Sequence, residues 1–363
     1  MSSGHPFSDG ARPQLTAEQQ RLASASRQPR LAGVLSTAPV TLGPFERFIS
    51  RPYFAELDGL RAISILLVIS FHLRDQRWLW LAGDNGVTIF FVISGFLITP
   101  LAIREERKTG RLDLKSFLLR RAFRLLPIYY VVLGAYAVAI LTLQPAKAPG
   151  LLHALPYLAF YFQEYPHYAG WTYPLYQTWS LGIEEKFYLL WPLLAFRVAL
   201  PFSRLRLTLS ACALFGICAL SPIGLLVFPY FHILVGCALA FLSHEPVWFE
   251  RLRKLTSGHR CWVWIAGFLL VHLTGDQMPS LSLGYPVLIG MVIASSVIEE
   301  RGILRWLSSS ALAYLGTLSY GIYLVHLAGI SAAERLFSSS PDSLARSPRS
   351  RPPAVVRLGS LSC

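Results

Sequence analysis

An arginine and a histidine in one apolar segment are the first residues whose spacing suggests chemistry. Arg61 and His72 lie 11 positions apart in ELDGLRAISILLVISFHL. At about 100° and 1.5 Å per residue, a helix would carry both side chains on one face, about 16 Å apart along its axis. A guanidinium at the mouth of a helix bundle suits phosphate binding, and a histidine deeper on the same line suits proton transfer. The alternative is an interfacial anchor arginine and a histidine bonded to a neighbouring helix.

Two further arginines precede another apolar run. Arg121 and Arg124 stand three positions apart in RRAFRLLPIYY, so a helix would point them the same way. Two guanidinium groups at an entrance suit a ligand that carries two or three phosphates. The alternative is an ordinary topology signal or a contact with anionic lipid.

Paired carboxylates interrupt a third apolar segment, QTWSLGIEEKFYLLWPLL. Glu184 and Glu185 would lie about 9 Å into a helix that starts at Trp179. A buried carboxylate is either paired or protonated, so either residue could orient the histidine or receive a proton. An ion pair with Lys186 or with a nearby arginine is the alternative.

Small and hydroxyl-bearing residues occur in two more segments. Ser94 and Gly95 lie within GVTIFFVISGFLIT, where small side chains let another helix or a ligand approach closely. Tyr320, Tyr323 and His326 follow one another at steps of three in LSYGIYLVHL, which makes a polar stripe on a helix. This stripe is expected to line the same cavity, and a packing stripe is the equal alternative.

The composition indicates which type of secondary structure carries these polar side chains. Hydrophobic residues make up 53% of the 363 residues and charged residues 15%, against about 25% in a soluble domain, yet the net charge is +13. This combination argues against a soluble enzyme and against a nucleic-acid-binding protein. It predicts an all-α, polytopic transmembrane bundle with its basic residues gathered on one side.

Apolar runs long enough for a bilayer of about 30 Å predict nine spans. They are expected near residues 57–74, 86–103, 121–143, 179–199, 206–221, 224–242, 261–275, 281–298 and 311–329. The segment 151–178 contains three prolines and is expected to be interfacial or re-entrant. With that topology and a cytoplasmic N-terminus, 23 basic residues up to the ninth span face the cytoplasm, six of them in the N-terminal segment, and three face outside, as the positive-inside rule requires.

Three parts of the chain are expected. Residues 1–52 form a disordered cytoplasmic segment, residues 53–329 form the membrane domain, and residues 330–363 form a disordered tail rich in Ser, Arg and Pro. Because an odd number of spans leaves five arginines of this tail outside, we expect the tail to replace a missing last helix. The alternative is a genuine tail on the outside.

In chain order, these segments resemble the acyltransferase-3 family of integral-membrane O-acyltransferases. The matching motifs are Leu-Asp-Gly-Leu-Arg-Ala with Arg-x10-His, Phe-Phe-x-x-Ser-Gly-Phe (90–96), Arg-x-x-Arg before Pro127, Trp-Ser-Leu-x-x-Glu-Glu-x-Phe-Tyr (179–188) and Ser-Tyr-x-x-Tyr-Leu-x-His (319–326). Many members carry Asp where this chain has Thr88. Members also continue through a last helix after the motif that ends at His326.

The resemblance implies a bundle of about ten helices that takes an acyl group, often acetyl, from acyl-CoA. By this resemblance His72 is the catalytic histidine, and Glu184 or Glu185 belongs to the acceptor half. The donor's phosphates would lie near Arg61, Arg121 and Arg124. The residues expected to line the acceptor side or the cavity are Ser94, Ser180, Tyr320, Tyr323 and His326. Acyl-CoA is then a substrate, and neither a bound cofactor nor a metal ion is expected.

The sequence thus predicts an O-acyltransferase of the inner (plasma) membrane that modifies a hydroxyl of a cell-surface carbohydrate or a similar, lipid-linked acceptor. Its partners would be acyl-CoA, that acceptor and the bilayer, with no nucleic acid. Whether His72 acts as a base or carries the acyl group itself is left open. Two alternatives are an acyl-group transporter without its own transfer step and an inactive, truncated remnant.

Overall fold

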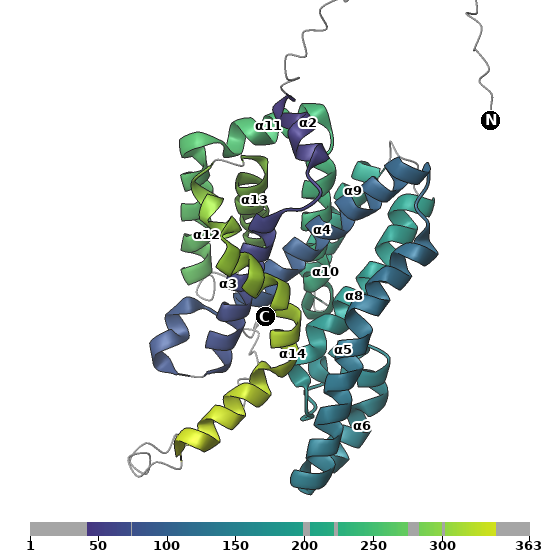
Figure 1. Ribbon diagram of the computed structural model, residues 1–363, viewed down its shortest axis with the longest axis vertical. Coiled ribbons are helices and arrows are strands. Elements are labelled where there is room, and N and C mark those ends of the chain that lie inside the picture. The colour runs from purple at the N-terminus through teal and green to yellow at the C-terminus, as the bar shows by residue number, and fades with distance from the viewer. Residues whose placement is uncertain are drawn as a thin grey trace, which may run out of the picture. The chain divides into compact units, whose positions relative to one another are not determined.

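Every regular element in the described part of the chain is a helix (Figure 1). The computed structural model describes residues 42–73, 75–198, 204–220, 224–274, 283–299 and 302–338. The α-helices are α2 (Pro44–Ser50), α3 (Ala55–His72), α4 (Asn85–Thr109), α5 (Leu114–Leu143), α6 (Ala148–Ala159), α7 (Glu164–Tyr168), α8 (Trp179–Leu193), α9 (Arg204–Ala219), α10 (Gly224–Ser243), α11 (Pro246–Thr256), α12 (Cys261–Thr274), α13 (Tyr285–Ile298) and α14 (Ser310–Ser338). The predicted all-α class is confirmed.

Each of the nine predicted spans overlaps one helix of the described residues, namely α3, α4, α5, α8, α9, α10, α12, α13 and α14. Four helical stretches in the described ranges are long and apolar enough to cross a bilayer: Gln76–Thr109, Leu114–Leu143, Leu226–Ser243 and Ser310–Leu336. The first begins with a 3-10 helix and continues through α4. The chain is therefore a membrane protein by its helices, while the count of nine spans stays a prediction.

The proline-containing segment 151–178 forms no long helix. It is divided between α6, α7 and a 3-10 helix at Tyr176–Thr178. Since a span needs roughly 20 residues, neither α6 nor α7 can cross a bilayer alone. An interfacial or re-entrant course for this segment agrees with these lengths.

The two ends of the described chain are more helical than expected. Helix α2 falls inside the segment predicted to be disordered, because Phe48 is buried against Phe249 of α11, with ring centroids 5.3 Å apart. Helix α14 continues past the predicted boundary at residue 329 to Ser338. The remaining residues of both predicted disordered segments, 1–41 and 339–363, lie outside the described residues.

Glycines bring two pairs of helices into backbone contact. A Cβ atom added to Gly95 of α4 would lie 1.9 Å from the carbonyl oxygen of Ile233 in α10, and one added to Gly236 of α10 would lie 2.1 Å from that of Val92. The predicted close approach at Gly95 is therefore made by another helix. Helices α3 and α14 meet in the same way at Gly316.

We expect Gly95→Ala to lower stability because the added methyl group has to push the α10 backbone away. Forcing an extra carbon into a packed contact costs about 1–3 kcal/mol. Thermal unfolding of the detergent-purified protein measures the loss. The matched control is Gly134→Ala, because Gly134 lies in α5 with no atom within 4 Å of an added Cβ. An equal melting temperature for the two variants would contradict the packing argument.

Candidate active site

One cavity of about 700 Å³ brings most of the predicted site residues together. It is lined by side chains from α3, α4, α5, α8 and α14 and by the segment that precedes α3. Eight predicted residues line it: Arg61, Ser94, Arg121, Arg124, Ser180, Glu184, Tyr320 and Tyr323. The other three predicted residues, His72, Glu185 and His326, are not part of its lining.

The cavity has a strongly cationic part. Arg61 projects from α3, whereas Arg121 and Arg124 come from the first turns of α5, so two helices far apart in the sequence supply the charge. The guanidinium of Arg121 lies over the ring of Tyr188, with its Cζ 3.2 Å from the centroid. This contact fixes the direction in which Arg121 points.

Two more arginines line this part of the cavity, and the sequence analysis did not single them out as ligand-binding residues. Arg120 forms an ion pair with Glu105 of α4. Arg104 donates hydrogen bonds to the carbonyl oxygens of Arg51 and Pro52, at 2.5 and 2.8 Å. Arg120 directly precedes the Arg-x-x-Arg motif, whereas Arg104 lies on α4 and is brought to the cavity only by the fold.

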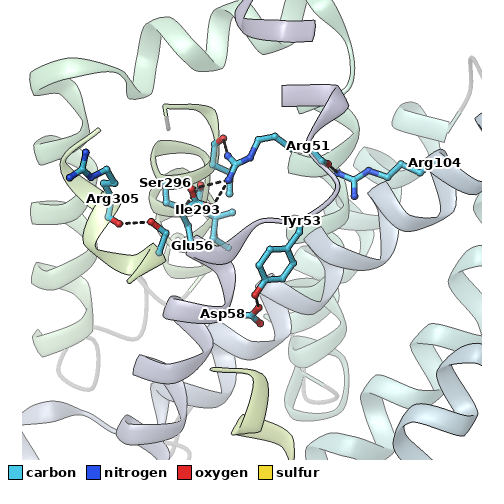
Figure 2. Close-up of polar contacts among 10 residues, drawn as sticks. Arg51, Tyr53, Glu56, Asp58, Arg104, Ile293, Ser296 and Arg305 are labelled. Carbon is cyan, nitrogen blue, oxygen red and sulfur yellow. Dashed lines mark hydrogen bonds and ion pairs between the residues drawn. The ribbon is translucent and has the colours of Figure 1, made fainter. Parts of the chain in front are cut away.

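The carboxylate Asp58 lies beside Arg61 on α3. Its Oδ1 is 3.6 Å from Nη1 of Arg61, and its Oδ2 accepts a hydrogen bond from the hydroxyl of Tyr53 (Figure 2). Partial burial and this hydrogen bond raise the pKa of Tyr53 to about 12. The phenol therefore remains a donor at neutral pH.

The paired glutamates have different surroundings. Glu184 lines the cavity and accepts a hydrogen bond of 2.8 Å from the hydroxyl of Ser94 on α4. Glu185 does not line the cavity. Both carboxylates lie within electrostatic reach of Arg121.

The ion pair of the glutamates with Lys186, which was the alternative expected from the sequence, is not formed. Lys186 instead bonds the Glu164 carboxylate of α7 at 2.5 Å and donates to the carbonyl oxygen of Tyr161 at 2.6 Å. Glu184 and Lys186 are two residues apart on a helix, which turns their side chains by about 200°, so Lys186 faces α7 while Glu184 faces α4. This leaves Glu184 directed to the cavity.

The two histidines pack against each other outside the lining. The ring centroids of His72 and His326 are 4.8 Å apart. Nδ1 of His72 lies 2.8 Å from the carbonyl oxygen of Val68, and Nδ1 of His326 lies 2.7 Å from that of Tyr323. A carbonyl oxygen only accepts, so both Nδ1 atoms carry hydrogen, and in the neutral form of each ring the lone pair is on Nε2.

The polar stripe of α14 therefore turns away from the cavity as the helix proceeds. Each step of three residues rotates the side chain by about 60° short of a full turn, so His326 is displaced by about 120° from Tyr320. Tyr320 and Tyr323 face the cavity, whereas His326 is 5% exposed and contacts His72. His72 shares its helix with Arg61 but lies in the last turn of α3.

Tyr323 connects the cavity with the histidine pair. Its hydroxyl donates to the carbonyl oxygen of Gln177 and accepts from the hydroxyl of Ser180, at 2.7 Å in the latter case. Its own carbonyl oxygen accepts the hydrogen bond of His326. Tyr323 is thus shared between the cavity wall and the backbone that supports His326.

Comparison with known proteins shows what the whole chain is similar to. A family model described as an acyltransferase domain matches residues 54–357. The chain is 30% identical over 318 residues to the peptidoglycan O-acetyltransferase OatA of Listeria monocytogenes, which covers 76% of this chain and 49% of OatA. It is 31% identical over 323 residues to a Staphylococcus aureus protein named as a putative O-acetyltransferase, which covers 79% and 52%. The chain thus spans about half the length of these relatives, and no solved structure matches it.

Proposed function

Because this chain belongs to the acyltransferase-3 family, we propose that it is a membrane O-acyltransferase that moves an acetyl group from acetyl-CoA to a carbohydrate hydroxyl. One observation carries the proposal. Arginines from α3 and α5 line the same cavity as the Glu184 carboxylate and several hydroxyl groups, so an anionic donor and a hydroxyl-bearing acceptor could meet there.

Arg61, Arg121 and Arg124 are the proposed phosphate ligands. Coenzyme A carries a diphosphate and a 3′-phosphate, and guanidinium groups bind phosphate oxygens through paired N–H donors. Arg104 and Arg120, which line the same part, add positive charge. The donor's nucleotide would therefore occupy the arginine-rich part of the cavity.

His72 is the proposed catalytic residue. It stands 11 residues beyond Arg61 on the uninterrupted helix α3, so the pantetheine arm has to cover about 16 Å. Because Nδ1 of His72 donates to Val68, the basic atom is Nε2. Nε2 would take the proton of the acceptor hydroxyl while its oxygen attacks the thioester carbon; the C–S bond then breaks, and the thiolate takes the proton from the imidazolium.

His72 could instead carry the acyl group. Nε2 would attack the thioester carbon, the thiolate would leave, and the acyl-imidazole would pass its acyl group to the acceptor hydroxyl, whose proton returns to the thiolate. Both routes begin at the same atom. Trapping an acyl-histidine after rapid acid quench distinguishes them.

Glu184 is the carboxylate proposed to act on substrate, since it faces the cavity and Glu185 does not. Its hydrogen bond to Ser94 leaves acceptor capacity for a substrate hydroxyl. Ser180, Tyr320 and Tyr323 add hydroxyl groups to the same wall. Such a surface suits a sugar, whose hydroxyl groups both donate and accept.

We place the protein in the plasma membrane with its N-terminus in the cytoplasm. Up to the ninth predicted span, 23 basic residues fall on the cytoplasmic side and three fall outside, which supports this orientation. It brings the arginine-rich part of the cavity to the side where acyl-CoA is made. The acceptor class follows the name of the Listeria relative, which acts on peptidoglycan.

The experiment that tests the proposed function follows labelled acetyl groups. Purified protein in lipid nanodiscs is mixed with [14C]acetyl-CoA and with water-soluble N-acetylhexosamine oligomers, and thiol release and labelled sugar are both measured. We expect both to rise with protein concentration. Absence of thiol release and of acetyl-CoA binding would exclude the proposal.

A further inference from the structure

The short segment between α2 and α3 is held from several sides by arginine side chains. Arg51 bonds both carboxylate oxygens of Glu56, at 2.7 and 2.9 Å, and the carbonyl oxygen of Val297 at 3.0 Å. Arg104 reaches from α4 to the backbone of this segment, as Figure 2 shows. These contacts hold the backbone of the segment that contains Tyr53.

Tyr53 stands at the cavity wall with half of its surface exposed, and its hydroxyl is directed to Asp58 (Figure 2). Asp58 itself has little freedom to move. Its side chain is 10% exposed, and its backbone carbonyl oxygen is pressed against Gly316 of α14. Any change in the carboxylate must therefore be a rotation of the side chain.

The carboxylate of Asp58 has two possible donors, and only Tyr53 is at hydrogen-bond distance. Arg61 Nη1 lies 3.6 Å from Oδ1, which is beyond a hydrogen bond. Among the described residues, the guanidinium of Arg61 makes no hydrogen bond, although it lines the cavity. Its N–H donors are thus available to a ligand, while the nearby negative charge still balances the guanidinium.

We propose that Tyr53 sets the affinity for the anionic donor, because its hydroxyl holds Asp58 away from Arg61 and keeps the Arg61 donors directed at a phosphate. This inference rests on the proposed function. Tyr53 is a positioning residue: it acts on the donor through Asp58 and Arg61. Without the hydroxyl, the carboxylate would rotate to accept a charge-assisted hydrogen bond from Arg61, and a phosphate would have to displace it.

The test compares Tyr53→Phe with the wild type in nanodiscs, using coenzyme A as the probe in calorimetric binding. A competing charge-assisted hydrogen bond predicts about tenfold weaker binding. In the transfer assay we expect the same factor in the KM for acetyl-CoA and little change in kcat. Tyr130→Phe is the matched control, since Tyr130 also donates a hydrogen bond, to Ala159, but does not line the cavity.

The second variant removes the competitor. In a protein that carries Asp58→Asn, the additional change Tyr53→Phe should have no effect on coenzyme A affinity, because no carboxylate is left to rotate onto Arg61. Weak binding that persists in the double variant, relative to Asp58→Asn alone, would overturn the inference. So would a Tyr53→Phe affinity within twofold of the wild type. No binding to the wild-type protein would instead overturn the proposed function, so the two failures are distinguishable.

Discussion

Replacing His72 with alanine is expected to lower the rate of acyl transfer by roughly 10²–10⁴-fold, the range that general acid–base catalysis contributes. The variant loses Nε2, the only atom to which we assign the proton transfer. The other ring nitrogen, Nδ1, donates a hydrogen bond to the carbonyl oxygen of Val68. Affinity for coenzyme A should stay within a factor of a few, because His72 does not line the cavity that holds the arginines. The measurement is kcat in nanodiscs beside calorimetric binding of coenzyme A.

The matched control is His153→Ala, because His153 is an exposed histidine stacked on Trp171 in the segment after α5. It should transfer acetyl groups at the wild-type rate. Turnover by His72→Ala equal to that of His153→Ala would remove His72 from the chemistry. A gel-filtration profile like that of the wild type shows that the His72 variant has folded.

The second large effect is expected for Arg61→Ala, which should weaken binding of the donor by roughly 10- to 100-fold. Hydrogen bonds to charged groups contribute about 1.5–3 kcal/mol each, and Arg61 lines the cavity without a hydrogen bond to any residue that the structure describes. Arg61→Lys keeps the charge but not the paired donors, so an intermediate affinity is expected. Calorimetric titration with coenzyme A measures the affinity of the wild type, Arg61→Ala and Arg61→Lys.

Arg77→Ala is the control for loss of positive charge. Arg77 is 80% exposed at its side chain, pairs with Asp75 and does not line the cavity. Its affinity for coenzyme A should equal that of the wild type. If Arg61→Ala bound as tightly as Arg77→Ala, the phosphates would have to lie elsewhere.

The helices could be predicted from the sequence because apolar runs of bilayer length have few other stable structures. Arg61 and His72 do share one uninterrupted helix, and Gly95 does mark a close approach of helices. These predictions depend on short-range periodicity alone. They needed no knowledge of which helix packs against which.

Features that depend on distant pairing could not be predicted in this way. The partner of Lys186 is Glu164. Glu164 lies on the short helix α7, which was not predicted because its segment contains several prolines. The spacing of three residues predicted that the polar stripe continues to His326. Because each such step also rotates the side chain about the helix axis, His326 faces His72 instead of the cavity. Helix α2 was not predicted because the composition of residues 1–52 as a whole is typical of disorder. That average conceals Phe48, which is buried and holds the short helix in place.

The contact between Tyr53 and Asp58 combines both kinds of information. Their separation of five residues across the start of α3 is visible in the sequence, but the hydrogen bonds from Arg104 of α4 to the backbone just before Tyr53 are not. A single sequence could therefore not show that the residue before the helix belongs to the site. The fold does, by placing Tyr53 in the cavity wall.

The donor is proposed to lie along α3, with its phosphates at the arginines and its acyl end at His72. A cryo-electron microscopy structure with a non-hydrolysable acetyl-CoA thioether tests this most directly. We predict the diphosphate beside Arg61 and Arg121 and the acetyl group next to Nε2 of His72. A diphosphate bound away from these arginines, or an acetyl group directed away from His72, would contradict this placement of the donor.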